Sequence, residues 1–196
     1  MSITNTWPLI LTLLLVISGC GTSQPSRFYL LNASNSAPLS SGESLTLGLG
    51  PIEFPAYLDR SKIMVRSGNN SFNAAEYHRW AEPLETNFTQ VLAQELRNIL
   101  PHANINIYPW RNSNEIKLQL RLEVLSFDSD NNKQARLVAR WQLIGSDKKP
   151  LGPPQQRQYI KTARSGEYEA RVAAMSECVT ALGLELAQAI DSVKTP

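Results

Sequence analysis

The chain has 196 residues, of which 42% are hydrophobic and 18% are charged, and its formal net charge is +2. This composition is typical of a folded chain with one core and excludes a disordered or collagen-like protein. A net charge of +2 is too small to indicate nucleic-acid binding, and no apolar stretch reaches the roughly 18 to 20 residues of a membrane-spanning helix.

The first 20 residues are typical of a bacterial lipoprotein leader. Residues 9–17 are apolar and match a signal-peptide core in length, and they are followed by Ser18, Gly19 and Cys20. This order is similar to the lipobox, in which the cysteine is acylated and the leader is cut before it. We therefore expect residues 1–19 to be a signal peptide and Cys20 to carry lipid. An ordinary signal peptide, or a buried segment that ends in cysteine, is the alternative.

The residues after the cysteine indicate a destination. Gly21 stands where Asp commonly retains a lipoprotein at the inner membrane, so we expect anchoring in the outer membrane, facing the periplasm. Residues 20–26 are then the lipidated cysteine and a short tether. The only other cysteine, Cys178, has no partner for a disulfide, and such a residue is usually a buried small hydrophobe.

Residues 27–196 are predicted to form one periplasmic domain. In its first half, short β-prone or alternating runs predict strands at 28–31, 45–52, 61–66 and 75–78, and polar segments predict loops at 32–43 and 68–71. A helix is predicted from Glu82 to the residue before Pro101. Its apolar positions recur at helical spacing and are Leu84, Phe88, Val91, Leu92, Leu96 and Ile99, which leaves Thr86, Gln90, Gln94 and Arg97 for solvent.

The second half is predicted to consist of strands followed by one long helix. The strands are expected at 105–108, 115–127, 134–144 and 156–162, and the helix at about 172–193. Asp128 and Asp130 are assigned to the turn between the second and third of these strands, where Asp is favoured for its bonds to the backbone. The element order predicts an α+β fold: a mixed or antiparallel sheet with two helices packed on one face and solvent on the other.

No motif in the sequence supplies a catalytic or metal site. Signatures of nucleophilic hydrolases, phosphate-binding loops, zinc proteases and redox cysteine pairs do not occur, and the two histidines, His78 and His102, are far apart. A periplasmic hydrolase would need a nucleophile and a base that the sequence does not offer. We therefore expect no enzyme activity, no cofactor, no metal and no nucleic-acid partner.

Two segments combine aromatic and charged residues in a way that core packing does not explain. Residues 50–60 form a proline-punctuated loop, and residues 76–84 precede the first helix. Tyr, Trp and Arg are enriched at interaction hot spots, so the candidate partner-binding residues are Tyr57, Asp59, Arg60, Arg79 and Trp80. The alternative is that Tyr57 and Trp80 pack the start of the helix while Asp59 and Arg60 pair with each other on the surface.

These segments also carry a resemblance to a known family. The lipobox, FYLL at 28–31, GPIEFPAYLDR at 50–60, IMV at 63–65 and RWAEPL at 79–84 resemble the ABC-type transport auxiliary lipoprotein family. Within that family they are most similar to the PqiC-type (YmbA-type) branch, the lipoprotein of the paraquat-inducible Pqi system. The resemblance covers nearly the whole mature chain.

The resemblance implies a non-enzymatic component of an intermembrane transport system. Its partners would be an MCE-domain protein of the Pqi type, which forms a tube across the periplasm, and an integral membrane protein. The lipoprotein would dock or support the far end of the tube, so that lipids move and the envelope stays intact. Assembly into a homo-oligomeric ring would fit this role. The alternative function is that of a lipid carrier or chaperone that holds an acyl chain in a groove between helix and sheet.

Overall fold

The computed structural model of the protein describes residues 24–39 and 44–193, so Cys20 and the signal peptide lie outside the described residues. Its strands are β1 (Arg27–Tyr29), β2 (Leu45–Glu53), β3 (Lys62–Arg66), β4 (Phe72–Trp80), β5 (Ala103–Ile107), β6 (Leu118–Asp130), β7 (Gln134–Gly145) and β8 (Gln155–Thr162). Its helices are α2 (Leu84–Ile99) and α3 (Tyr168–Ser192), and two short 3-10 turns are η1 (Ala56–Leu58) and η2 (Ser113–Glu115).

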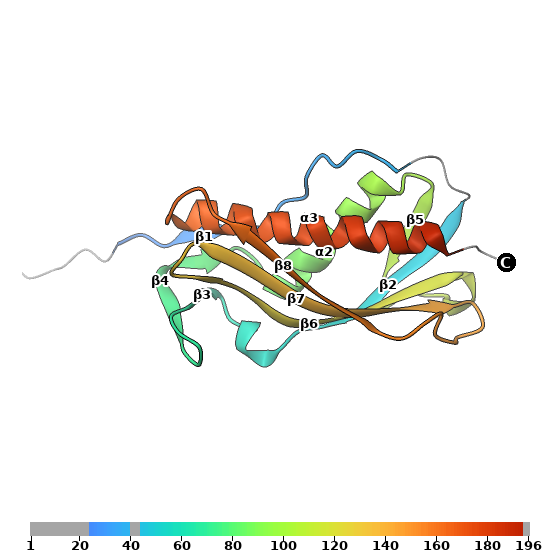
Figure 1. Cartoon of the computed structure of the whole chain (residues 1–196), viewed down its shortest axis with the longest axis horizontal. Coiled ribbons are helices and arrows are strands. Elements are labelled where there is room, and N and C mark those ends of the chain that lie inside the picture. Colours follow the sequence, from blue (N-terminus) through green and yellow to red (C-terminus); the bar gives the residue numbers. More distant parts are fainter. Residues whose placement is uncertain (1–23, 40–43, 194–196) are drawn as a thin grey trace, which may run out of the picture.

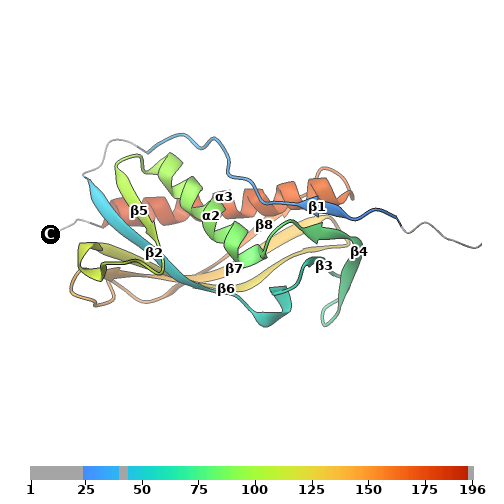
Figure 2. The ribbon, with the colours of Figure 1, turned by 180° about the vertical axis from the view of Figure 1, so that it is seen from behind.

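The sheet is mixed and is organised around β6, its longest strand. On one side β6 pairs antiparallel with β7, which in turn pairs with the edge strand β8. On the other side the first half of β6 pairs with β2 and its last two residues pair with β3, both in parallel. Strands β5 and β1 then extend the sheet beyond β2 and β4. Both helices cover the same face of the sheet (Figure 1; Figure 2), which confirms the predicted α+β class.

The core lies between this sheet and the two helices. Alternate residues of β6 and β7 face the helices and are buried, as the alternating pattern predicted, and Lys117 and Arg121 are exposed to solvent. Helix α2 buries the predicted apolar positions and exposes Thr86, Gln90, Gln94 and Arg97. The rings of Phe54, Phe88 and Phe127 stack edge to face at centroid separations of 5.1 and 5.5 Å, which joins the loop after β2, α2 and β6.

Several boundaries differ from the prediction for local reasons. Strand β4 runs from Phe72 to Trp80 rather than over 75–78, because it pairs with β3 on one side and β1 on the other. Helix α2 begins at Leu84, since the backbone of Pro83, with φ −53° and ψ 129°, is not helical. Strand β6 covers 118–130 rather than 115–127, because the Asn112 side chain accepts a bond from the Asn114 N–H and starts the turn η2.

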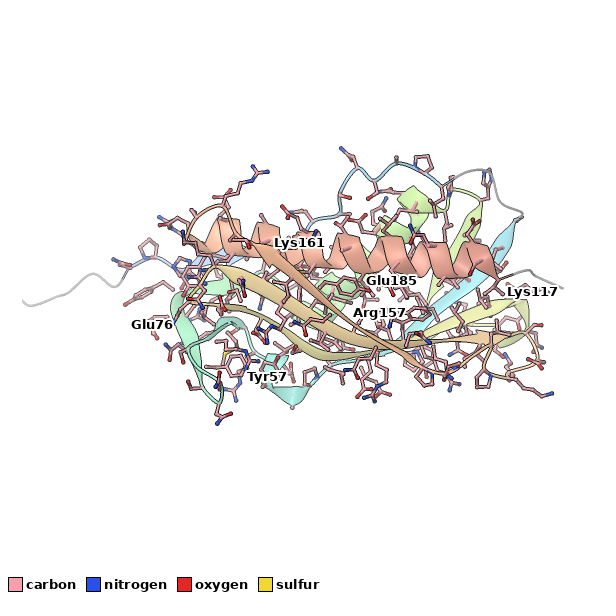
Figure 3. All side chains as sticks on the ribbon, viewed as in Figure 1. Tyr57, Glu76, Lys117, Arg157, Lys161 and Glu185 are labelled. Atoms are coloured by element: carbon pink, nitrogen blue, oxygen red, sulfur yellow. The ribbon has the colours of Figure 1, made fainter. Side chains whose placement is uncertain are left out.

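Helix α3 is also attached to β8 at the edge of the sheet. The Glu185 carboxylate of α3 accepts a hydrogen bond from the Tyr159 hydroxyl at 2.8 Å and pairs with the Arg157 guanidinium at 2.9 Å (Figure 3). Burial and the neighbouring carboxylate raise the pKa of Tyr159, so its hydroxyl stays protonated and continues to donate. The edge strand therefore has a fixed position against the helix.

Residues 30–39, here called the strap, follow β1 and run over the helices (Figure 1; Figure 2). The loop predicted in this part of the chain is present, and the Glu95 side chain of α2 fastens it. The fully buried Glu95 carboxylate accepts bonds from the Ser34 N–H at 2.7 Å, from the Ser34 and Ser36 hydroxyls, each at 3.1 Å, and from the Thr180 hydroxyl of α3 at 2.6 Å. Four donors thus compensate a charge that burial alone would disfavour.

The two helices come close together at the same carboxylate. A Cβ atom added to Gly183 of α3 would lie 3.0 Å from the Cβ of Glu95, so a larger residue there would require the two helices or the Glu95 side chain to shift. Further along the strap, the Asn98 side chain donates to the Ser34 carbonyl at 2.9 Å, and the Leu39 N–H donates to the Ile99 carbonyl at 2.9 Å. The strap is therefore an ordered part of the helical layer.

We expect Glu95→Ala to lower the free energy of unfolding of the mature protein by about 2–4 kcal/mol, because it leaves half-buried donors of the strap and α3 without this acceptor. Urea unfolding followed by circular dichroism measures the change. Gln90→Ala, at an exposed position of the same helix, is the matched control and should change stability by less than about 0.5 kcal/mol. Equal stability of the two variants would contradict a fastening role for Glu95.

Candidate functional site

The loop between β2 and β3 carries the first of the two candidate segments. Tyr57 lies in η1 and is half-buried, and Figure 3 shows it on the side of the sheet away from α3. Its hydroxyl donates to the Asp128 carboxylate at 3.3 Å and accepts from the Phe127 N–H at 3.3 Å. Burial, and then the nearby Asp128 charge, raise the pKa of Tyr57 to about 12. The Tyr57 hydroxyl therefore stays protonated at neutral pH and joins this loop to β6 by hydrogen bonds.

The carboxylate that receives this bond lies in a place the sequence did not predict. Asp128 was assigned to a turn, but it is a buried residue of β6, 1% exposed. The register between β6 and β7 shifts between Val124 and Ser126, which interrupts the alternation. Phe127 packs against the Phe88 ring, and Asp128 reaches Tyr57. Asp130 does serve the turn, since it accepts bonds from two backbone N–H groups.

Asp128 also forms the most buried ion pair of the described residues. The Arg66 guanidinium donates to both carboxylate oxygens, at 3.0 Å each, and lies 4.4 Å from the centroid of the Phe72 ring. The hydrogen bond to Asp128 raises the pKa of Arg66. The Tyr57 ring lies 5.0 Å from the same Phe72 ring. The loop, the β3–β4 hairpin and β6 are thus joined by one charged and aromatic cluster.

The two candidate segments meet at one place, here called the corner, which consists of residues 57–61 together with Arg79 and Trp80. The Trp80 N–H donates to the Ser61 carbonyl at 2.8 Å, and Lys62 is paired across the strands with Arg79. Trp80 is 6% exposed and belongs to the core. Sequence reasoning therefore identified segments that are neighbours in space, although Trp80 lies beneath the surface.

The charged residues of the corner remain accessible. Asp59 and Arg60 are exposed, and none of the ion pairs within the described residues includes either of them. The surface pairing of Asp59 with Arg60, the alternative interpretation of this segment, is therefore not formed. Arg79 is half-buried, and its Nε is buried without a hydrogen-bond partner among the described residues. The corner thus presents charged groups on a firmly packed base.

The residues most suited to chemistry are used for packing. The Tyr29 hydroxyl bonds to His78 Nδ1 at 2.7 Å, and the His78 ring stacks on Tyr168 at 3.7 Å, while burial and the Arg27 charge lower the pKa of His78. Burial raises the pKa of the Cys178 thiol to about 12, so it remains an unreactive thiol at neutral pH.

In the part of the chain that the structure describes, no group of three or more His, Cys, Asp or Glu residues is arranged to hold a metal ion. Neither described helix is both long and apolar enough to cross a membrane.

An aromatic surface that the sequence analysis did not single out lies beside Ile116, next to Lys117, which Figure 3 shows at the opposite pole. This surface, here called the tip, consists of Tyr108, Pro109 and Trp110. Tyr108 is 52% exposed, and its ring meets the Trp110 ring edge to face at 5.2 Å. Trp110 lies against Gly48 of β2, where an added Cβ would come within 3.0 Å of the indole. The YPW sequence at 108–110, directly after a strand, was the signal that could have revealed it.

Comparison with known proteins gives a family and a fold. A family model described as "ABC-type transport auxiliary lipoprotein component" matches residues 29–187. A Xanthomonas campestris protein of the family DUF330 has 15% identity and a TM-score of 0.71, covering 84% of this chain and 95% of its own. An uncharacterized protein has 17% identity and a TM-score of 0.69, covering 85% and 99%.

A PelC dodecamer from Paraburkholderia phytofirmans has 13% identity and a TM-score of 0.44, covering 81% of this chain and 96% of its own. No curated protein matches the chain by sequence. The structural similarities concern the fold alone, whereas the family model covers most of the chain, including both segments of the corner. The chain belongs to the family of ABC-type transport auxiliary lipoprotein components.

Proposed function

We propose that this protein is an outer-membrane lipoprotein that faces the periplasm and acts as a non-enzymatic adaptor in an MCE-type intermembrane lipid transport system. The observation that carries the proposal is the corner, where Asp59 and Arg60 are exposed and take part in none of the ion pairs of the described residues. Charged groups held on a rigid base, with Trp80 and the Tyr57–Asp128 bond beneath them, suit recognition of a protein surface. The proposed partner is the MCE-domain protein of the Pqi type, with its integral membrane partner.

The lipid anchor gives the adaptor its advantage. A tether from Cys20 to β1 keeps the domain within a thin layer beside its membrane, which raises its effective concentration for any partner that reaches that layer. Three acyl chains, as bacterial lipoproteins carry, would make the anchoring effectively permanent, whereas a single chain binds only marginally. The lipobox order at residues 17–20 and the membership of a lipoprotein family support this part of the proposal.

The alternative function is that of a carrier that holds an acyl chain between helix and sheet. In the described structure this seam is filled by side chains that are 1% exposed or less, including Phe88, Leu92, Leu120 and Phe127. An acyl chain would have to displace them, since carrier sites are preformed apolar cavities. The packing therefore favours the adaptor. Native mass spectrometry of the lipidated protein would favour the carrier if it revealed an additional, exchangeable lipid.

Self-assembly into a ring is the remaining part of the proposal. Among the described strands β8 pairs only with β7, so its other edge is free, and a free edge is a template for pairing with a second chain. The same native mass spectra would report a ring as integral multiples of the mass of one chain. A strictly monomeric protein at all concentrations would remove the ring while leaving the adaptor.

We expect Cys20→Ala, expressed behind an ordinary signal peptide, to abolish incorporation of labelled palmitate and to release the protein from the outer-membrane fraction, because Cys20 is the proposed acylation site. Metabolic labelling and density-gradient fractionation of the envelope measure both effects. Cys178→Ala, which removes the other cysteine, is the matched control and should keep label and position. Banding of the wild-type protein with the inner membrane would contradict the proposed location, and full function of a soluble Cys20→Ala protein would contradict tethering.

We expect a photo-reactive amino acid at Asp59 or Arg60 to crosslink to the MCE-domain protein in intact cells, because both side chains project from the corner into solvent. Mass spectrometry of the crosslinked product identifies the partner. The matched control carries the probe at Gln90, which is also exposed but lies on α2. Absence of protein crosslinks at both corner positions, or equal yields at Gln90, would contradict the corner as the docking surface.

A further inference from the structure

Two large apolar side chains are exposed where β1 passes into the strap. Phe28 is 63% exposed and Leu30 is 42% exposed, and they alternate with Tyr29 and Leu31, which face inward. Residues two apart in an extended chain point to the same side, so Phe28 and Leu30 form one surface, here called the patch. They also form one wall of an open cleft of about 450 Å³, opposite Val172 and Ala173 of α3.

The exposure of the patch does not come from a loose chain end. The Tyr29 carbonyl accepts from the Ala81 N–H at 3.0 Å, the Leu31 N–H donates to Asn87 Oδ1 at 2.6 Å, and the Asn32 N–H donates to Ser176 Oγ at 3.1 Å. Both residues of the patch thus lie in a backbone fixed on either side. Phe28 and Leu30 therefore point outward, and their apolar side chains are not part of the core.

The position of the patch in the chain indicates what covers it. Cys20 precedes Phe28 by eight residues, a separation of about 28 Å at full extension and about 15 Å as a random coil. An acylated Cys20 therefore holds the patch within reach of the bilayer surface. Arg79 is paired with Phe28 across the strands, which puts a cation beside the patch, where lipid phosphates would lie.

We propose that Phe28 and Leu30 insert into the surface of the membrane that holds the lipid anchor. This contact rests on the proposed lipidation of Cys20 and adds a defined orientation to it: the β1 pole faces the bilayer and the tip with Tyr108 faces away. Arg79, the corner residue paired with Phe28, then lies toward the headgroups, and Asp59 and Arg60 remain the corner residues proposed to dock the protein partner. The anchor supplies attachment, and the patch supplies the direction in which the domain stands.

The test places a tryptophan in the patch of the full, lipidated protein. Phe28→Trp is reconstituted into vesicles of phosphatidylethanolamine and phosphatidylglycerol whose acyl chains are either brominated or plain, and vesicle flotation verifies anchoring. Leu151→Trp is the matched control, because Leu151 is 49% exposed and lies beside Leu143, toward the end of β6 and β7 that is away from β3. Leu30→Trp is a second reporter, and thermal melts verify that each variant folds as the wild type does.

We expect bromine to reduce the emission of the added tryptophan roughly twofold or more in Phe28→Trp and in Leu30→Trp, as for a side chain at the headgroup–acyl boundary. Leu151→Trp should show no such loss. Flotation without quenching at either patch position would overturn the membrane contact and leave the anchor in place. A blue-shifted but unquenched tryptophan would also overturn it, because protein or the chain's own acyl group would then cover the patch. Failure to float would overturn the anchor and the patch together.

Discussion

One buried carboxylate, that of Glu95, fixes how the N-terminal part of the chain meets the two helices. It lies where α2 and α3 come close together, and donors from the strap and from Thr180 satisfy it. The strap continues directly from β1, so holding the strap helps to hold β1 against β4. Directional hydrogen bonds thus set the position of the β1 end of the domain, from which the chain leads back toward Cys20. Apolar packing alone does not provide such directionality.

A second buried carboxylate, that of Asp128, similarly fixes the position of segments away from the helices. Asp128 pairs with Arg66 through two bonds and receives the Tyr57 hydroxyl, so that β3, β6 and the loop before β3 share one anchor point. A buried ion pair of this kind contributes little net stability, because desolvation offsets much of the attraction. Its effect is positional: it holds the loop that leads to Asp59 and Arg60. A surface held in place before binding loses less entropy when a partner docks.

Periodicity was sufficient to predict α2, the β6–β7 hairpin and α3, because each buries one continuous face. It failed where polar residues are buried. An acidic side chain in a helix is normally exposed, but that of Glu95 is buried. The strap that covers it is distant in sequence. Asp128 was assigned to a turn because a shift in strand register has no signature in one sequence. The corner was found by composition, but composition could not tell that alternation in β4 buries Trp80 and leaves Arg79 beside solvent.

Insertion of the patch into a membrane is too weak to act without the proposed lipid anchor. Burying the exposed parts of Phe28 and Leu30 in lipid is worth about 2–4 kcal/mol in total, which corresponds to an affinity no better than about millimolar. The patch alone would therefore not hold the protein on a membrane. If acylation of Cys20 confines the domain to within about 28 Å of the bilayer, as we propose, the contact becomes effectively intramolecular, and this modest energy suffices to select one orientation. In this proposal attachment and orientation are supplied by different residues: Cys20 carries the lipid, and the exposed apolar side chains of Phe28 and Leu30 follow it by eight and ten residues.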